Sequence, residues 1–109
     1  MAVPDAAHAR AAMESQAFDV ALLARDLHPG QIGFAGEAEH VDGFELARWA
    51  SKRDAALSVI VMAEGLAMDD ALTAMRAGAC DVIETGLRGD EVLRHVMPAI
   101  ERTKRLRER

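Results

Sequence analysis

The chain has 109 residues, of which 50% are hydrophobic and 28% are charged. This is long enough for one compact domain with an apolar core and too short for two. A formal net charge of −5 argues against a general electrostatic affinity for nucleic acid or for anionic lipid. The single cysteine, Cys80, excludes an internal disulfide, and no apolar run is long enough to span a bilayer, so we expect a cytoplasmic protein.

The first half of the chain predicts a helix, a strand, a long loop and a second helix. Residues 5–16 are rich in alanine and predict a helix that Asp5 caps. The continuous apolar run DVALLA, residues 19–24, is typical of a strand covered on both faces. Glycines and a proline between residues 28 and 41 predict a long loop. FELARWASKRD then predicts a helix that begins at Asp42 or Gly43.

The second half continues the alternation of strands and helices. LSVIVM, residues 57–62, predicts a strand rich in β-branched residues. GLAMDDALTAMRAG follows as a helix, with acidic residues in its first turn and Gly78 just past its end. CDVIE, residues 80–84, predicts a short strand. From Gly89 onward the pattern is helical, and we expect Pro98 to kink this helix or to begin a new one.

Strands that alternate with helices at this spacing predict an α/β fold, a parallel sheet with crossover helices, built as a single domain over residues 1–109. We found no internal repeat and no low-complexity segment.

Several segments resemble the receiver domain of bacterial two-component response regulators. They are FDVALLARDLHPG, VDGFELARWA, VIVMAEG and, most specifically, ALTAMRAGACDVIETGL. The resemblance runs from about residue 6 to the end of the chain, with residues 31–40 as a loop insertion. It implies a flavodoxin-like sheet that lacks the N-terminal strands. The basic helix at residues 98–109 is similar to the end of receivers that precede PAS, kinase or cyclase modules, and it could lead into a coiled coil.

The resemblance also implies a phosphorylation site whose chemical groups are absent. The phosphoacceptor position falls on Ala24, the hydroxyl position on Ala63, and the Lys-Pro pair on Thr85-Gly86. The acid pair that would hold Mg²⁺ belongs to the missing N-terminal part. We therefore expect a degenerate receiver, a pseudo-receiver, with no catalytic residue, no cofactor and no metal.

Loss of the first two strands makes residues 19–24 an edge strand. An apolar edge beside Val20, Leu22 and Leu23 recruits other strands, so a second copy of the chain or a partner is expected to complete the sheet. A different interpretation stays open, in which the chain is a fragment or its start is misassigned.

The last helix offers a second contact surface. Its candidate interface residues are Val96, Thr103 and Leu106, which with Val92 and Ala99 follow a spacing of four and three residues. This is the spacing of a coiled-coil seam. We expect its first half, Val92, Val96 and Ala99, to cover the sheet, and the sequence leaves open whether the second half pairs with another chain or ends as a solvated basic segment.

Other candidate residues carry weaker functional signals. We expect Asp26 to bond the loop backbone rather than to accept phosphate. Cys80 is expected to be a small buried residue, the methionines to be core or interface residues, and Trp49 to be half-buried. A loop metal site is the remaining candidate, although its ligand spacing matches no known pattern. Its residues are His28, Glu37, Glu39, His40 and Asp42.

The sequence therefore favours a non-catalytic, phosphorylation-independent interaction or dimerisation module of two-component signalling. The expected partners are a second copy of the chain and a histidine kinase, a cyclase or another signalling protein, not nucleic acid or a membrane. The alternative is a small-ligand or nucleotide-binding domain that uses the emptied cleft around Ala24, Ala63 and Thr85.

Overall fold

A computed structural model describes residues 6–27, 41–65 and 67–108. Its centre is a three-stranded parallel sheet in the order β1-β4-β5. The strands are β1 (Val20–Ala24), β4 (Ser58–Ala63) and β5 (Asp81–Glu84), which confirms the three predicted strands to within one residue at their ends. The central strand is the most buried, since Val59, Ile60 and Val61 are fully covered.

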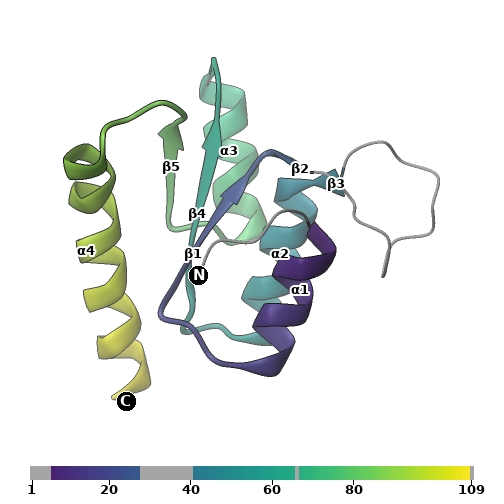
Figure 1. Ribbon diagram of the computed structural model, residues 1–109, viewed down its shortest axis with the longest axis vertical. Coiled ribbons are helices and arrows are strands. Elements are labelled where there is room, and N and C mark those ends of the chain that lie inside the picture. Colours follow the sequence, from purple (N-terminus) through teal and green to yellow (C-terminus); the bar gives the residue numbers. More distant parts are fainter. Residues whose placement is uncertain (1–5, 28–40, 66, 109) are drawn as a thin grey trace.

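Helices cover both faces of this sheet (Figure 1). They are α1 (Ala6–Ser15), α2 (Gly43–Arg53), α3 (Met68–Ala77) and α4 (Gly89–Arg107). Side chains that alternate along the strands form two cores. Leu23, Val59 and Val61 pack with α1, α2 and α3, whereas Ile60 and Ile83 pack with Ala99 of α4. One long helix therefore covers one face and three shorter helices cover the other.

A short antiparallel stem that the sequence did not predict follows β1. Strand β2 (Asp26–Leu27) pairs with β3 (Val41–Asp42), so the long loop begins and ends at neighbouring points. The proposed insertion at residues 31–40 lies outside the described residues. Strand β3 of this stem leads directly into Gly43, the first residue of α2.

Gly43 begins α2 where the helix meets the end of β1. Its N–H donates to the carbonyl of Arg25 at 2.6 Å, and a β-carbon at this position would overlap the carbonyl oxygen of Ala24. Only glycine permits so close an approach of two backbones. The Asp-Gly pair in the sequence thus fixes the start of α2 against the edge where the candidate site lies.

Helix α4 runs through Pro98 as one continuous element. The alternative in which a new helix begins at this residue was therefore wrong. Proline removes one backbone donor, and the packing of Ala99 and Thr103 on the sheet holds the helix together beyond it. The helix is also tied to β5, because His95 Nδ1 lies 2.6 Å from Asp81 Oδ2.

Buried hydroxyl groups anchor the second half of α4. Thr103 Oγ1 lies 2.7 Å from Ser58 Oγ and donates to the Asp19 carbonyl at 2.6 Å. Ser58 Oγ in turn lies 2.8 Å from the Ala99 carbonyl. Further along the helix, Arg107 donates to the Phe18 carbonyl and to Asp54 Oδ2, each at 2.8 Å. The basic end of the chain is therefore docked on the body of the domain.

Candidate functional site

The carboxyl ends of the three strands lie together at one end of the sheet, which we call the carboxyl edge. The three positions that the sequence singled out meet there. Ala24 is the last residue of β1, Ala63 the last of β4, and Thr85 directly follows β5. The strands are parallel and adjacent, and the Thr85 N–H donates to the Ala63 carbonyl at 3.2 Å. Two of the three side chains are methyl groups, which offer neither a nucleophile nor a metal ligand.

Arg25 occupies this edge, which the sequence analysis did not anticipate. Its guanidinium lies 3.3 Å from Asp70 Oδ2 in the first turn of α3, and it donates to the Glu64 carbonyl at 3.3 Å. The two side chains of this ion pair are 27% and 30% exposed, so water only partly screens the attraction. Arg25 thereby links the end of β1 to the start of α3.

The acidic groups at the edge are engaged with the backbone of the segment that joins β4 to α3. Glu84 Oε2 accepts the Gly65 N–H at 3.2 Å, and Asp70 Oδ2 accepts the Ala67 N–H at 3.1 Å. Among the residues that the structure describes, no three side chains of His, Cys, Asp or Glu gather as a metal site. The local charges thus hold the turn in place, and Arg25 balances one of them.

The interface candidates on β1 differ in how far they are covered. Leu23 is only 5% exposed and belongs to the core under α2. Val20 and Leu22 are half-buried and pack on the opposite face, against the cluster of Ile60, Ile83 and Ala99. Of the described strands, only β4 pairs with β1, so the other side of β1 is the edge of the sheet, as the sequence predicted.

The interface candidates on the last helix need one correction. Val96 and Leu106 are half-buried, but Thr103 is 0% exposed and packs within its own chain. The seam interpretation was wrong for Thr103, because its hydroxyl bonds inward to Ser58 and to the Asp19 carbonyl. The Thr103 side chain is therefore not available to a partner helix.

Most of the proposed loop ligands cannot be placed. His28, Glu37, Glu39 and His40 lie outside the described residues, and only the backbone pairing of Asp26 with Asp42 is described. The loop metal site therefore stays a prediction.

Cys80 is half-buried, and burial raises the pKa of its thiol above the ordinary value, with nearby Arg102 offsetting this only in part. The thiol therefore stays protonated at neutral pH. Trp49 is half-buried, as expected, and the guanidinium carbons of Arg10 and Arg53 lie over its ring, 4.8 and 5.7 Å from the ring centroid.

Three of the methionines assigned to the core or to an interface are exposed instead of buried in the core. Met68 and Met75 share one side of α3 with Leu72, and Met97 lies near Leu93 on α4. Exposed apolar side chains in such groups are a common feature of contact surfaces.

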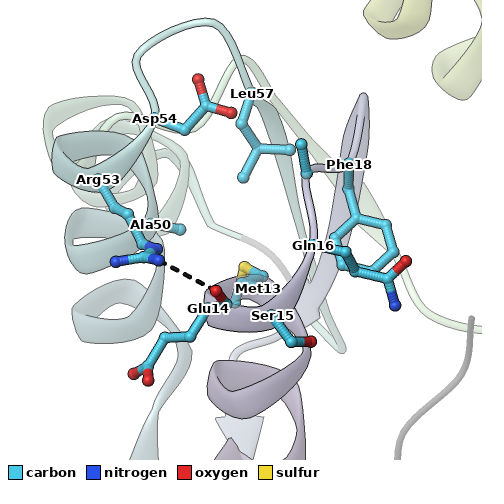
Figure 2. Close-up of a pocket in the computed structure, with 10 residues that line it drawn as sticks. Met13, Glu14, Ser15, Gln16, Phe18, Ala50, Arg53, Asp54 and Leu57 are labelled. Carbon is cyan, nitrogen blue, oxygen red and sulfur yellow. Dashed lines mark hydrogen bonds between the residues drawn. The ribbon is translucent and has the colours of Figure 1, made fainter.

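A pocket of about 490 Å³ lies at the opposite end of the sheet, beside the amino ends of the strands (Figure 2). Phe18 and Leu57 provide apolar walls, and Arg53 reaches across to donate to the Glu14 carbonyl at 3.2 Å. Its remaining lining residues are Met13, Ser15, Gln16, Ala17, Ala50 and Asp54. This pocket does not coincide with the cleft around Ala24, Ala63 and Thr85.

Comparison with known proteins gives a consistent fold. No protein-family model and no curated protein matches the sequence. Among solved structures, NtrX from Brucella abortus is 27% identical with a TM-score of 0.78, and the match covers 97% of this chain and 22% of that one. The receiver domain of a putative LuxO repressor from Vibrio parahaemolyticus is 22% identical with a TM-score of 0.75, covering 94% of this chain and 70% of that one.

A third similar structure is the beryllofluoride-activated receiver domain dimer of NtrC4. It is 18% identical with a TM-score of 0.70, and the match covers 89% of this chain and 71% of that one. The chain thus spans about a fifth of the NtrX structures and about 70% of the isolated receiver domains.

These similarities define the chain as a receiver-like α/β domain. Its parallel sheet and flanking helices match the fold of response-regulator receivers. Within the described part of the chain, no helix has the length and apolar character needed to cross a membrane.

Proposed function

We propose that this domain is a non-catalytic, phosphorylation-independent pseudo-receiver that acts in the bacterial cytoplasm as a protein–protein interaction or dimerisation module. It would contact a second copy of itself, a histidine kinase, a cyclase or another signalling protein. It would also work beside PAS, kinase or cyclase modules.

The observation that carries this proposal is the composition of the carboxyl edge. Ala24, Ala63 and Thr85 meet there with Arg25, whose charge is already paired with Asp70. Phosphoryl transfer to a protein carboxylate requires a nucleophile, a metal held by hard oxygen ligands and positioned cations. Ala24 and Ala63 supply none of these groups, the carboxylates of Glu84 and Asp70 accept backbone N–H groups, and the cation Arg25 is engaged with Asp70.

The remaining surface supports an interaction role. The outer edge of β1 is apolar, and Met68, Leu72 and Met75 present a group of exposed apolar side chains on α3. Surfaces of this kind are more useful for contact with another protein than for chemistry.

The proposal is tested by incubation with acetyl phosphate and Mg²⁺, followed by intact mass measurement with an active receiver domain in parallel. We expect no phosphoryl adduct on this chain and an adduct on the control. The Ala24→Asp variant is a matched control, and we expect no adduct on it either, since one carboxylate restores neither the metal ligands nor the missing cation. A stoichiometric aspartyl phosphate on the unaltered chain would falsify the proposed function.

A further inference from the structure

The outer edge of β1 presents a defined set of backbone groups. The Asp19 carbonyl accepts from the Ser58 N–H and the Arg25 N–H donates to the Met62 carbonyl, so the odd-numbered residues of this strand direct their backbone groups toward β4. In a parallel pair the intervening residues direct both groups the other way. The N–H and C=O groups of Val20, Leu22 and Ala24 therefore point away from the sheet.

Nothing in β1 itself prevents pairing along this edge. Its sequence, VALLA, contains no proline and no charge, and the strand is paired residue for residue with β4 without a bulge. Natural edge strands usually carry one of these protective features. This edge is therefore competent to bind a further strand.

The residues that flank the strand favour one particular occupant. Asp19 precedes β1 and Arg25 follows it, so the segment DVALLAR carries opposite charges at its two ends. Asp19 lies beside Arg107 of α4 and Arg25 beside Asp70 of α3, at the two ends of the strand. A strand of opposite direction and the same sequence would set each carboxylate opposite a guanidinium.

We propose that β1 pairs antiparallel with β1 of a second copy, with Leu22 opposite the second copy's Leu22, Val20 opposite its Ala24, and Asp19 opposite its Arg25. This inference rests on the proposed interaction role and specifies its partner and geometry. The pairing joins two three-stranded sheets into one continuous sheet around a two-fold axis at Leu22.

The register follows from two independent requirements. Val20, Leu22 and Ala24 hold the outward backbone groups, and only a two-fold axis at Leu22 lets all of them form hydrogen-bonded pairs. The same axis aligns Asp19 with Arg25 of the second copy. Moving the register by two residues leaves one outward residue unpaired and separates the charges.

A parallel arrangement of two copies is disfavoured by charge. In register, it would set Asp19 beside Asp19 and Arg25 beside Arg25, and like charges directly opposite one another destabilise a sheet. In the antiparallel arrangement both flanking residues can keep their own partners. Arg25 stays near Asp70, and Asp19, whose side chain is 51% exposed, stays near Arg107.

Amide hydrogen exchange followed by NMR tests the pairing on the whole chain. We expect the amides of Val20, Leu22 and Ala24 to become protected at high protein concentration and to exchange rapidly after dilution. The amides of Ala21 and Leu23 serve as internal controls, since they bond to β4 and should stay protected at both concentrations. Sedimentation of the same samples reports the oligomeric state.

The register is tested by disulfide trapping in a Cys80→Ala background. A mixture of Asp19→Cys and Arg25→Cys chains should form a crosslinked heterodimer, because directly opposite residues lie about 4.5 Å apart between α-carbons, within disulfide range. Either variant alone should not crosslink, since its two cysteines would be separated by six residues, or about 20 Å.

Two results would overturn the inference. One is a dimer in which Val20, Leu22 and Ala24 stay unprotected, which would assign the contact to another surface such as the apolar side of α3. The other is a monomer whose edge amides exchange rapidly at every concentration, which would leave the edge to a strand of a different protein. The proposed function fails if the chain forms a phosphoryl adduct, whereas the pairing fails by amide exchange and crosslinking. The two failures are therefore distinguishable.

Discussion

Arg25 follows Ala24 directly in the sequence, and its guanidinium joins the end of β1 to Asp70 and to the Glu64 carbonyl. The resemblance to receivers indicates the positions where functional groups are absent, but it does not indicate which neighbouring side chain occupies the space. A charged residue that follows a buried strand can contact many different partners, so its sequence position does not identify one. The partner of Arg25 is Asp70, 45 residues further along the chain. Only the fold brings the two side chains together.

Asp54 carries the first prediction at the residue scale. Burial alone would raise the pKa of this carboxyl, but hydrogen bonds from Arg107 and from the Ala56 N–H, together with the charge of Arg107, outweigh burial and lower the pKa below its ordinary value of 3.8. A carboxyl whose pKa is lower in the folded than in the unfolded chain stabilises the fold above the unfolded pKa. That contribution is lost as the pH falls through the folded pKa.

We therefore expect Asp54→Asn to lower the free energy of unfolding by about 0.5–1 kcal/mol at pH 7, since the ion pair is partly exposed. The difference from the unaltered chain should shrink as the pH falls below 3.8, the ordinary value of this carboxyl. Urea unfolding at several pH values measures it, with Glu101→Gln on the exposed side of α4 as the control. A deficit that stays constant into acid would show that the charge of Asp54 is not responsible.

At the scale of elements, the order of strands and helices was predictable because each leaves a local signal. The apolar runs at 19–24 and 57–62 and the Gly78 helix stop all correspond to observed boundaries within one residue or so. Gly78 has a φ of 108°, which explains why glycine ends α3. The β2–β3 stem was missed because two residues on each side carry no periodicity.

The interface interpretation of Thr103 was wrong for a similar reason. A spacing of four and three residues describes one side of a helix, and it does not say what that side contacts. Ala99 and Thr103 contact their own sheet, and the hydroxyl of Thr103 finds buried partners that no sequence pattern announces. Ala99 and Thr103 are the buried residues of this helix.

The buried hydroxyl pair gives the prediction at this scale. Replacing Thr103 with valine keeps the shape but removes the donor to the Asp19 carbonyl and the contact with Ser58. We expect the free energy of unfolding to fall by about 1–3 kcal/mol, because buried polar groups lose their partner. Thr103→Ser retains the hydroxyl and should cost less, and urea unfolding separates the two variants. An unchanged stability with stronger self-association of Thr103→Val would instead favour a partner helix at this position.

At the scale of the whole molecule, the last helix makes contacts that hold the domain together. The basic end of α4 returns to the acidic body, where Arg107 meets Asp54 and lies 3.7 Å from Asp19. This contact closes the domain at the amino ends of the strands. Among the described strands none pairs with the opposite side of β1, and a parallel sheet of three strands buries only a small apolar core.

Self-association through β1 would make stability depend on protein concentration, since folding and dimer formation are then linked. We expect the melting temperature to rise by about 3 °C for each tenfold increase in concentration, given the unfolding entropy usual for a domain of this length. Circular dichroism at concentrations that differ a hundredfold measures this change.

Ala24→Pro is the matched variant for this measurement. The Ala24 N–H points outward, so proline removes an edge donor without breaking a bond to β4, and it leaves a strand that cannot pair in the proposed register. Its melting temperature should be independent of concentration and close to that of the unaltered chain at high dilution. A concentration dependence that survives in Ala24→Pro would place the self-contact elsewhere on the molecule, while a constant melting temperature in both chains would mean that the open side of β1 is tolerated by the isolated domain.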